Sequence, residues 1–172
     1  TKETRKKNLV FWISVAKKAL KSKNYDTLMC ILSAVNNISI QRLDCFKELD
    51  IETKNTLQQL LNTMNYEKNY SNYRNKLSKE IGKAFPYIGV VIKDIVTATD
   101  VNVLKTFDRE TLQIMYNIIY PVAEIRKHLV ISNLTSNNLE WLYEIETHGI
   151  VDLHRLSGNI KPIDKTSQID FK

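Results

Sequence analysis

Glycine and proline are scarce in this sequence, with four and three copies among 172 residues. β-Sandwiches and barrels need many tight turns, so this scarcity counts against both architectures and favours helices. No apolar run approaches the ~20 residues that a membrane-spanning helix requires. The N-terminal stretch is too basic and too often interrupted to be a signal peptide. A chain of this length is long enough to enclose one hydrophobic core.

Cysteine is also rare, and the two copies, Cys30 and Cys45, form no C-x-x-C pair. Because each lies in an apolar periodic segment, we expect both thiols to be reduced and buried. Reduced thiols are typical of intracellular proteins, so we expect a cytoplasmic location, with the cytoplasmic face of membranes as the alternative. His128, His148 and His154 lack the spacing of metal ligands, and two cysteines cannot form a zinc site by themselves. We therefore expect no metal site.

The motifs of several enzyme classes are missing. The sequence has no G-x-x-x-x-G-K-[ST] motif, so it should not bind nucleotides through a P-loop. It also lacks the H-E-x-x-H motif of zinc proteases and the G-x-S-x-G nucleophile elbow of hydrolases. We expect neither a cofactor nor covalent chemistry.

Positive charge is in excess, with a formal net charge of +6 and a pI near 9.2. The excess is concentrated near the N-terminus, in Lys2, Arg5, Lys6, Lys7, Lys17, Lys18, Lys21 and Lys23. Such a cluster can bind nucleic acid or an anionic membrane surface. A solvated lysine-rich face is the more common outcome, and we favour it, expecting no nucleic-acid partner.

Helical spacing of apolar residues recurs along the chain and predicts one all-α domain over residues 1–172. The predicted helices cover about 4–23, 27–35, 40–46, 51–64, 70–81, 86–100, 109–125 and 138–147. Residues suited to cap helix N-termini precede four of them, namely Asp26, Ser39, Asp50 and Asp108. Gly82 and Gly149 are placed at helix ends.

Four further residues carry expectations about packing. Trp12 and Trp141 lie on apolar faces and are expected in the core. Ile51 should open the buried stripe of its helix. Pro121 falls inside a helical pattern, where it should kink or split the helix.

The stretch from residue 85 to residue 100, FPYIGVVIKDIVTATD, is dense in β-branched residues, and periodicity alone leaves strand and helix both possible. On a helix, Ile88, Ile92, Ile95 and Val96 would share an apolar anchoring face. A second stripe would hold Lys93, Thr97 and Asp100. That combination suits a helix that inserts into a partner.

Several blocks of the sequence resemble the catalytic domain of Ras-family guanine-nucleotide exchange factors. They are LMCILSAVN at 28–36 with IQRL at 40–43, YSNYR at 70–74, PYIGVVIKD at 86–94, and LHRLS at 153–157 with IKP at 160–162. The resemblance implies a multi-helix orthogonal domain with a protruding helical hairpin, at about 86–128 here. It covers only the larger, C-terminal part of that domain, which has further helices before the point matched by Thr1.

The resemblance also implies a function, the release of GDP from a Ras-family small GTPase. The partner supplies the nucleotide and Mg²⁺, and the membrane is reached only through it. Val96 matches the residue that crowds the Mg²⁺ site, and Asp100 matches the acid that engages the phosphate loop. The family usually has leucine and glutamate there, so both side chains are one methylene shorter here. Val96 as a core residue and Asp100 as a helix cap remain the alternatives.

A second group of residues matches positions that grip the switch regions of the GTPase. Its members are Met29, Asn36, Ile38, Gln41, Arg42, Tyr73, Tyr87, Lys93 and Thr97. We expect Tyr73 and Tyr87 to be exposed, because tyrosines amid polar residues suit a binding surface. Core packing of Met29 and Ile38, a C-cap role for Asn36 and a helix-bridging role for Arg42 are the alternatives.

Two other functions remain open. A domain of this fold could dock a GTPase without driving exchange, which the short Val96 and Asp100 and the position of Pro121 motivate. The basic N-terminus motivates a helical module that binds polyanions.

Overall fold

The computed structural model describes residues 1–100, 109–125 and 150–160. The named elements in these ranges are all helices, which confirms the all-α prediction. They are α1 (Lys2–Lys21), α2 (Tyr25–Val35), α3 (Ile38–Gln41), the 3-10 helix η1 (Asp44–Phe46), α4 (Ile51–Thr63), α5 (Glu67–Leu77), α6 (Ile88–Asp100), α7 (Arg109–Ile125) and α9 (Ile150–Ile160). The helix predicted at 138–147, Trp141, Gly149 and the Asp108 cap lie outside the described residues. None of the described helices is long and apolar enough to cross a membrane.

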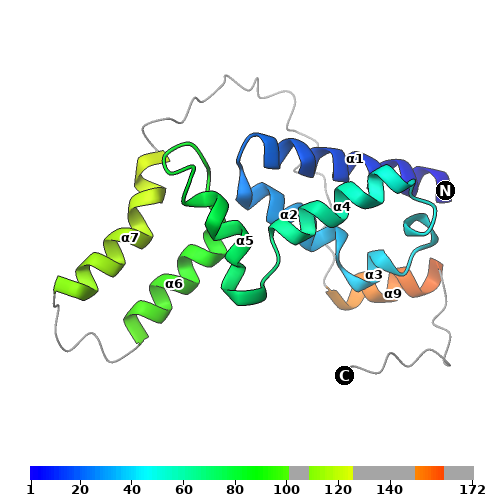
Figure 1. The fold of residues 1–172 in the computed structure, drawn as a ribbon. Coiled ribbons are helices and arrows are strands. Elements are labelled where there is room, and N and C mark those ends of the chain that lie inside the picture. The colour runs from blue at the N-terminus through cyan, green and yellow to red at the C-terminus, as the bar shows by residue number, and fades with distance from the viewer. Residues whose placement is uncertain (101–108, 126–149, 161–172) are drawn as a thin grey trace, which may run out of the picture.

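The helices form a body and a projecting arm (Figure 1). In the body, α1 packs against α2, α4 and η1, and α9 lies against α3. The arm consists of α6 and α7, which pack side by side at the other end of the molecule. α5 lies between the body and the arm, so its side chains can hold one to the other.

The core is built from the apolar stripes of the body helices. Four helices contribute almost fully buried side chains, among them Ala16, Leu28, Leu60 and Tyr73. Val90 of α6 joins the same cluster, which ties the base of the arm to the body.

The observed first residues of the helices show which of the predicted N-cap residues are correct. Asp50 caps α4 as predicted, since its Oδ1 accepts the Thr53 N–H at 2.7 Å. This hydrogen bond lowers the pKa of the Asp50 carboxyl. The predicted caps Asp26 and Ser39 are wrong, because Asn24 and Asn37 accept the first free N–H groups of α2 and α3. Both helices begin two residues earlier than predicted, and Asp26 is then free to contact another helix.

Burial corrects three predictions. Trp12 is 43% exposed, because the buried stripe of α1 runs through Leu9, Ile13 and Ala16, on which Trp12 borders without joining it. Ile51 is 77% exposed, since burial in α4 begins only at Leu57. Cys30 is exposed on the outer side of α2, whereas Cys45 is buried as predicted.

The region from α5 to the end of α7 tests three further predictions. α5 ends at Leu77 rather than near residue 81, and Gly82 adopts a left-handed φ of 74° in the turns that follow. α7 contains Pro121 and continues as one element to Ile125, so the helix is not split there, and a kink at Pro121 stays a prediction. The stretch that could have been strand or helix is a helix, α6.

Candidate functional site

The first turn of α6 is capped by side chains from two other helices. The Tyr87 N–H donates to the Tyr73 hydroxyl at 2.9 Å, and the Ile88 N–H donates to Asp26 Oδ1 at 3.0 Å. Helix N-termini need such acceptors, and the FPYI sequence offers no Ser, Thr, Asp or Asn to supply one locally. Phe85 adds two backbone hydrogen bonds, accepting from the Tyr25 N–H and donating to the Lys23 carbonyl, both at 2.9 Å. The base of the arm is therefore fixed to α2 and α5.

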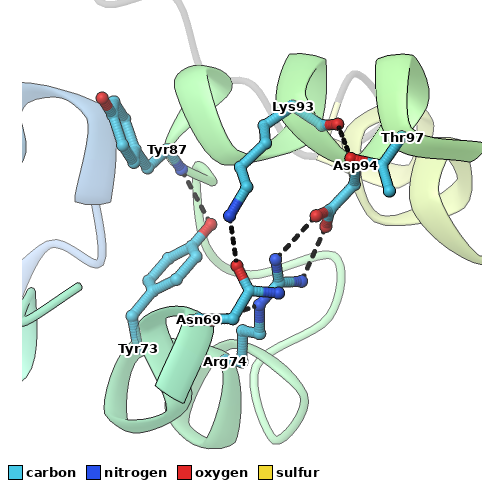
Figure 2. Close-up of polar contacts among 7 residues, drawn as sticks. All are labelled: Asn69, Tyr73, Arg74, Tyr87, Lys93, Asp94 and Thr97. Atoms are coloured by element: carbon cyan, nitrogen blue, oxygen red, sulfur yellow. Dashed lines mark hydrogen bonds and ion pairs between the residues drawn. The ribbon is translucent and has the colours of Figure 1, made fainter. Parts of the chain in front are cut away.

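The second turn of α6 is held by an ion pair (Figure 2). The two terminal nitrogens of Arg74 donate to the two carboxylate oxygens of Asp94, each at 2.7 Å. The hydrogen bonds that it donates to this carboxylate raise the pKa of the Arg74 guanidinium. Lys93, next to Asp94, donates from Nζ to Asn69 Oδ1 at 2.8 Å. We did not predict the Arg74–Asp94 pair, although both residues stand in blocks that carry the family resemblance.

Asn69 belongs to an unusual turn within the first residues of α5. Lys68, Asn69 and Tyr70 have φ values of 48°, 56° and 60°, in the left-handed region that residues with a Cβ rarely adopt. The turn is held from outside, because the Asn69 carbonyl accepts the Arg74 Nε–H at 2.8 Å.

Tyr73 corrects the prediction of an exposed tyrosine. It is only 1% exposed and packs edge-on against Tyr25, with ring centroids 5.2 Å apart. Burial raises the pKa of its phenol to about 12. Tyr87 is half-buried and lies edge-on to Tyr70. Tyr70, three residues earlier, has left-handed rather than helical backbone geometry and lines a cavity at the surface.

Beyond its anchored base, α6 presents apolar side chains to solvent. Ile92 is 55% exposed and Val96 is 53% exposed. The predicted anchoring face is therefore wrong, because the anchors are the buried Val90 and the paired Asp94. Thr97 is exposed, with its hydroxyl donating to the Lys93 carbonyl, and Asp100 is the last residue of α6.

α7 also exposes apolar side chains. Its exposed apolar side chains are Leu112, Ile114, Tyr116, Ile119 and Tyr120. Two of them, Tyr116 and Tyr120, stack with ring centroids 5.1 Å apart. The arm is thus apolar on a surface that the rest of the described chain leaves exposed.

A cavity of about 440 Å³ opens between α2, α4 and the N-terminal end of α5. Among its lining residues are two of the predicted contacts, Met29 and Asn36, together with Tyr66 and Tyr70. The prediction missed Tyr70, and the only available signal was its place in the YSNYR block, where either tyrosine could have faced outward. An amphipathic aromatic at the mouth of a cavity is typical of a binding surface.

The other predicted contacts lie around the end of α2. Gln41 donates from Nε2 to Asn36 Oδ1 at 2.6 Å, and Asn36 is also the C-cap of α2. Ile38 is exposed, so core packing does not account for it. Arg42 reaches towards α9, since a Cβ added at Gly158 would lie 3.9 Å from its Nη1, and this favours the helix-bridging alternative.

The described residues offer no cluster of three or more His, Cys, Asp or Glu side chains that could hold a metal ion. The features of this site are those of a surface that binds another protein. It combines an exposed apolar arm, anchored at its base, with a neighbouring cavity for a partner side chain.

Comparison with known proteins assigns a family to this architecture. The RasGEF domain matches residues 1–118, which include α1 to α6 and the first part of α7. The chain is 25% identical to Ras guanine nucleotide exchange factor D of Dictyostelium discoideum, with 93% of the chain covered, and 26% identical to human Ras guanyl-releasing protein 3, with 98% covered. It is 36% identical to Ras guanine nucleotide exchange factor K of Dictyostelium discoideum over 54% of the chain. The matched region spans 25% of the length of each of the first two relatives.

Proposed function

The chain belongs to the family of RasGEF domains, and from this membership we propose that it promotes the release of GDP from a Ras-family small GTPase. The names of its relatives designate Ras exchange factors, and its partner would be a GTPase of the same kind. The observation that carries the proposal is the α6–α7 arm, whose base is fixed by Asp26, Tyr73 and Arg74 and whose outer part exposes apolar side chains.

Exchange of this kind requires no covalent step. A protein that binds the nucleotide-free GTPase more tightly than the nucleotide-bound form must weaken nucleotide binding by the same factor. Guanine nucleotides are held through Mg²⁺ and phosphate contacts from mobile switch loops. A rigid helix that enters between these loops would compete with those contacts.

Within the arm, Val96 and Asp100 are proposed to act on the nucleotide site. Val96 lies half a turn beyond the last anchor, Asp94, and is exposed, as a wedge against the Mg²⁺ site must be. Asp100 ends α6 and would bring a carboxylate to the phosphate loop, where it competes with phosphate for the same donors. Lys93 and Thr97 lie on the neighbouring surface of α6 and would contact the switch regions.

The cavity beside the arm is proposed to hold an aromatic or aliphatic side chain of a switch loop. Met29 gives it an adaptable apolar wall, and Tyr70 and Asn36 add polar groups at its surface. Gln41 and Ile38 extend the same contact surface, while Tyr87 lies edge-on to the ring of Tyr70.

The proposal is tested by the release rate of a fluorescent GDP analogue from a panel of Ras, Rap and Ral GTPases. We expect acceleration of one of them, and we expect Asp100→Ala and Val96→Ala to reduce it at least about fivefold, the lower end of usual coupling free energies. Matched controls are Asp152→Ala on α9 and Ile51→Ala on α4, which remove an exposed aspartate and an exposed branched side chain elsewhere. A folded chain that accelerates no GTPase but binds one without nucleotide would be a docking domain.

The charge of α1 supports a second candidate, binding to a polyanion. This helix has seven basic residues and one acidic residue, Glu3. Lys2 is engaged with Glu48, which neutralises part of the excess. Binding that weakens steeply with added salt would support this function, whereas salt-insensitive one-to-one GTPase binding would contradict it.

A further inference from the structure

One guanidinium holds both parts of the proposed site. Arg74 donates from its two terminal nitrogens to Asp94 of α6 at 2.7 Å, and from Nε to the Asn69 carbonyl at 2.8 Å. Its five donors lie in a rigid plane, so the directions to these two acceptors are fixed relative to each other. Figure 2 shows Asn69 and Asp94 on opposite sides of the Arg74 side chain.

The two acceptors belong to different functional parts. Asp94 is the last anchored residue of the arm and lies only two residues before Val96. Asn69 precedes Tyr70, whose ring lines the cavity and lies edge-on to Tyr87. A shift of either acceptor would therefore be transmitted through the guanidinium to the other part.

We propose that Arg74 is a positioning residue that fixes the α6–α7 arm relative to the Tyr70 cavity, so that a GTPase gripped at the cavity meets the arm in one orientation. The inference rests on the proposed exchange function. The Arg74 side chain is only partly accessible and its donors are engaged by Asp94 and Asn69, so its contribution is made through these two residues rather than by contact with the GTPase.

The backbone of the turn explains why this contact matters. Three consecutive left-handed residues are each disfavoured by roughly 1–2 kcal/mol, so the turn at 68–70 persists only where its surroundings hold it. Arg74 and Lys93 supply the side-chain contacts to Asn69. Lysine at position 74 would keep the charge but lose the planar fork, so it could not satisfy Asp94 and Asn69 together.

The arm position is measured first, independently of any GTPase. Spin labels are attached at Cys30, which is exposed on α2, and at a cysteine introduced by Gln113→Cys on α7, in a Cys45→Ala background. Electron–electron resonance then gives the distance distribution between body and arm. We expect Arg74→Lys to broaden it, and Asp94→Asn to do the same from the other side of the pair. The control Arg155→Lys alters an exposed ion pair on α9 and should leave it unchanged.

Exchange kinetics of the full chain provide the second measurement. We expect Arg74→Lys to lower kcat by roughly tenfold, since ångström-scale misplacement of a reacting group can reduce rates by up to about a hundredfold. Arg155→Lys should match the wild type. A distance distribution in Arg74→Lys and Asp94→Asn that equals the wild type overturns the positioning role, whatever the kinetics. If the wild type accelerates no GTPase, the exchange function fails, while the distance measurement still decides whether Arg74 sets the arm.

Discussion

The backbone N–H of Ile88 donates to the carboxylate of Asp26, 62 residues earlier in the chain, at 3.0 Å. The first turn of α6 is thus capped by a side chain of α2, and the arm begins where the body dictates. A helix that projects from a body needs such a fixed origin, since a rigid arm transmits any error at its base to its tip.

Replacing Asp26 by alanine should destabilise the protein by about 1 kcal/mol, the usual effect of removing an N-cap acceptor. The measurement is chemical denaturation followed by circular dichroism. Asp26→Asn is the matched control, because its side-chain oxygen can still accept from Ile88. Equal stabilities of the two variants would show that this hydrogen bond contributes nothing.

Gly89 and Gly158 form a natural pair for a test of packing on the arm. A Cβ at Gly89 would lie 2.5 Å from the Cζ and hydroxyl oxygen of Tyr87, whereas a Cβ at Gly158 would find its nearest neighbour at 3.9 Å. Gly158→Ala should raise the free energy of unfolding by about 0.5–1 kcal/mol through helix propensity. Gly89→Ala should lower it by about 1 kcal/mol, because overpacking outweighs that gain.

Thermal or urea unfolding of both variants decides the matter. The prediction for Gly89 would be refuted by a stabilisation equal to that of Gly158→Ala. A displaced Tyr87 ring should also reduce its edge contact with Tyr70, which the aromatic resonances of an NMR spectrum would report.

The family and the helical class could be predicted from sequence, because they depend on periodicity and on ordered blocks of residues. The way in which the arm is fixed to the body could not be predicted, because the residues that anchor it lie far away in the sequence. Asp26 is as good a local cap for α2 as it is a distant cap for α6, and only the fold decides between them. Tyr73 was predicted at the surface in place of Tyr70 for a related reason. Residues three apart on a regular helix share a face, and the point at which regular α5 geometry begins was not predictable from the sequence. The roles of Val96 and Asp100 come from the resemblance and await kinetics.

The left-handed turn predicts an unusual response to glycine. Lys68→Gly should stabilise the protein by about 1 kcal/mol, because glycine adopts a φ of 48° without the clash of a Cβ. The same substitution within regular helix, Lys17→Gly in α1, should destabilise by about 1 kcal/mol. Urea denaturation of both variants measures the two free energies. Destabilisation by Lys68→Gly would mean that the left-handed turn is not the ground state.

Because the phenol of Tyr73 is buried, we expect the folded protein to lose stability at high pH. Burial raises the pKa of its phenol from 10.0 to about 12, so the folded state favours the neutral form. The corresponding stability is fully present below pH 10 and is lost as the pH rises towards 12 and beyond. Tyr73→Phe should be less sensitive to pH across this window, as measured by denaturation at fixed pH values. Tyr66→Phe, at an exposed tyrosine, is the control and should retain the pH response of the wild type.

Because Val96 and Asp100 have short side chains, we expect longer side chains at these positions to increase the proposed exchange activity. Val96→Leu restores one methylene, which corresponds to about 0.8 kcal/mol of apolar burial against the GTPase, or roughly a fourfold faster release of GDP. Asp100→Glu lengthens the carboxylate by the same step and should act in the same direction. Ile92→Leu is the matched control, because it alters an equally exposed residue of α6 at constant volume. Release rates that rise with Val96→Leu and stay constant with Ile92→Leu would support a wedge at Val96. A decrease with Val96→Leu would instead mean that the proposed GTPase partner accommodates only the smaller side chain at this position.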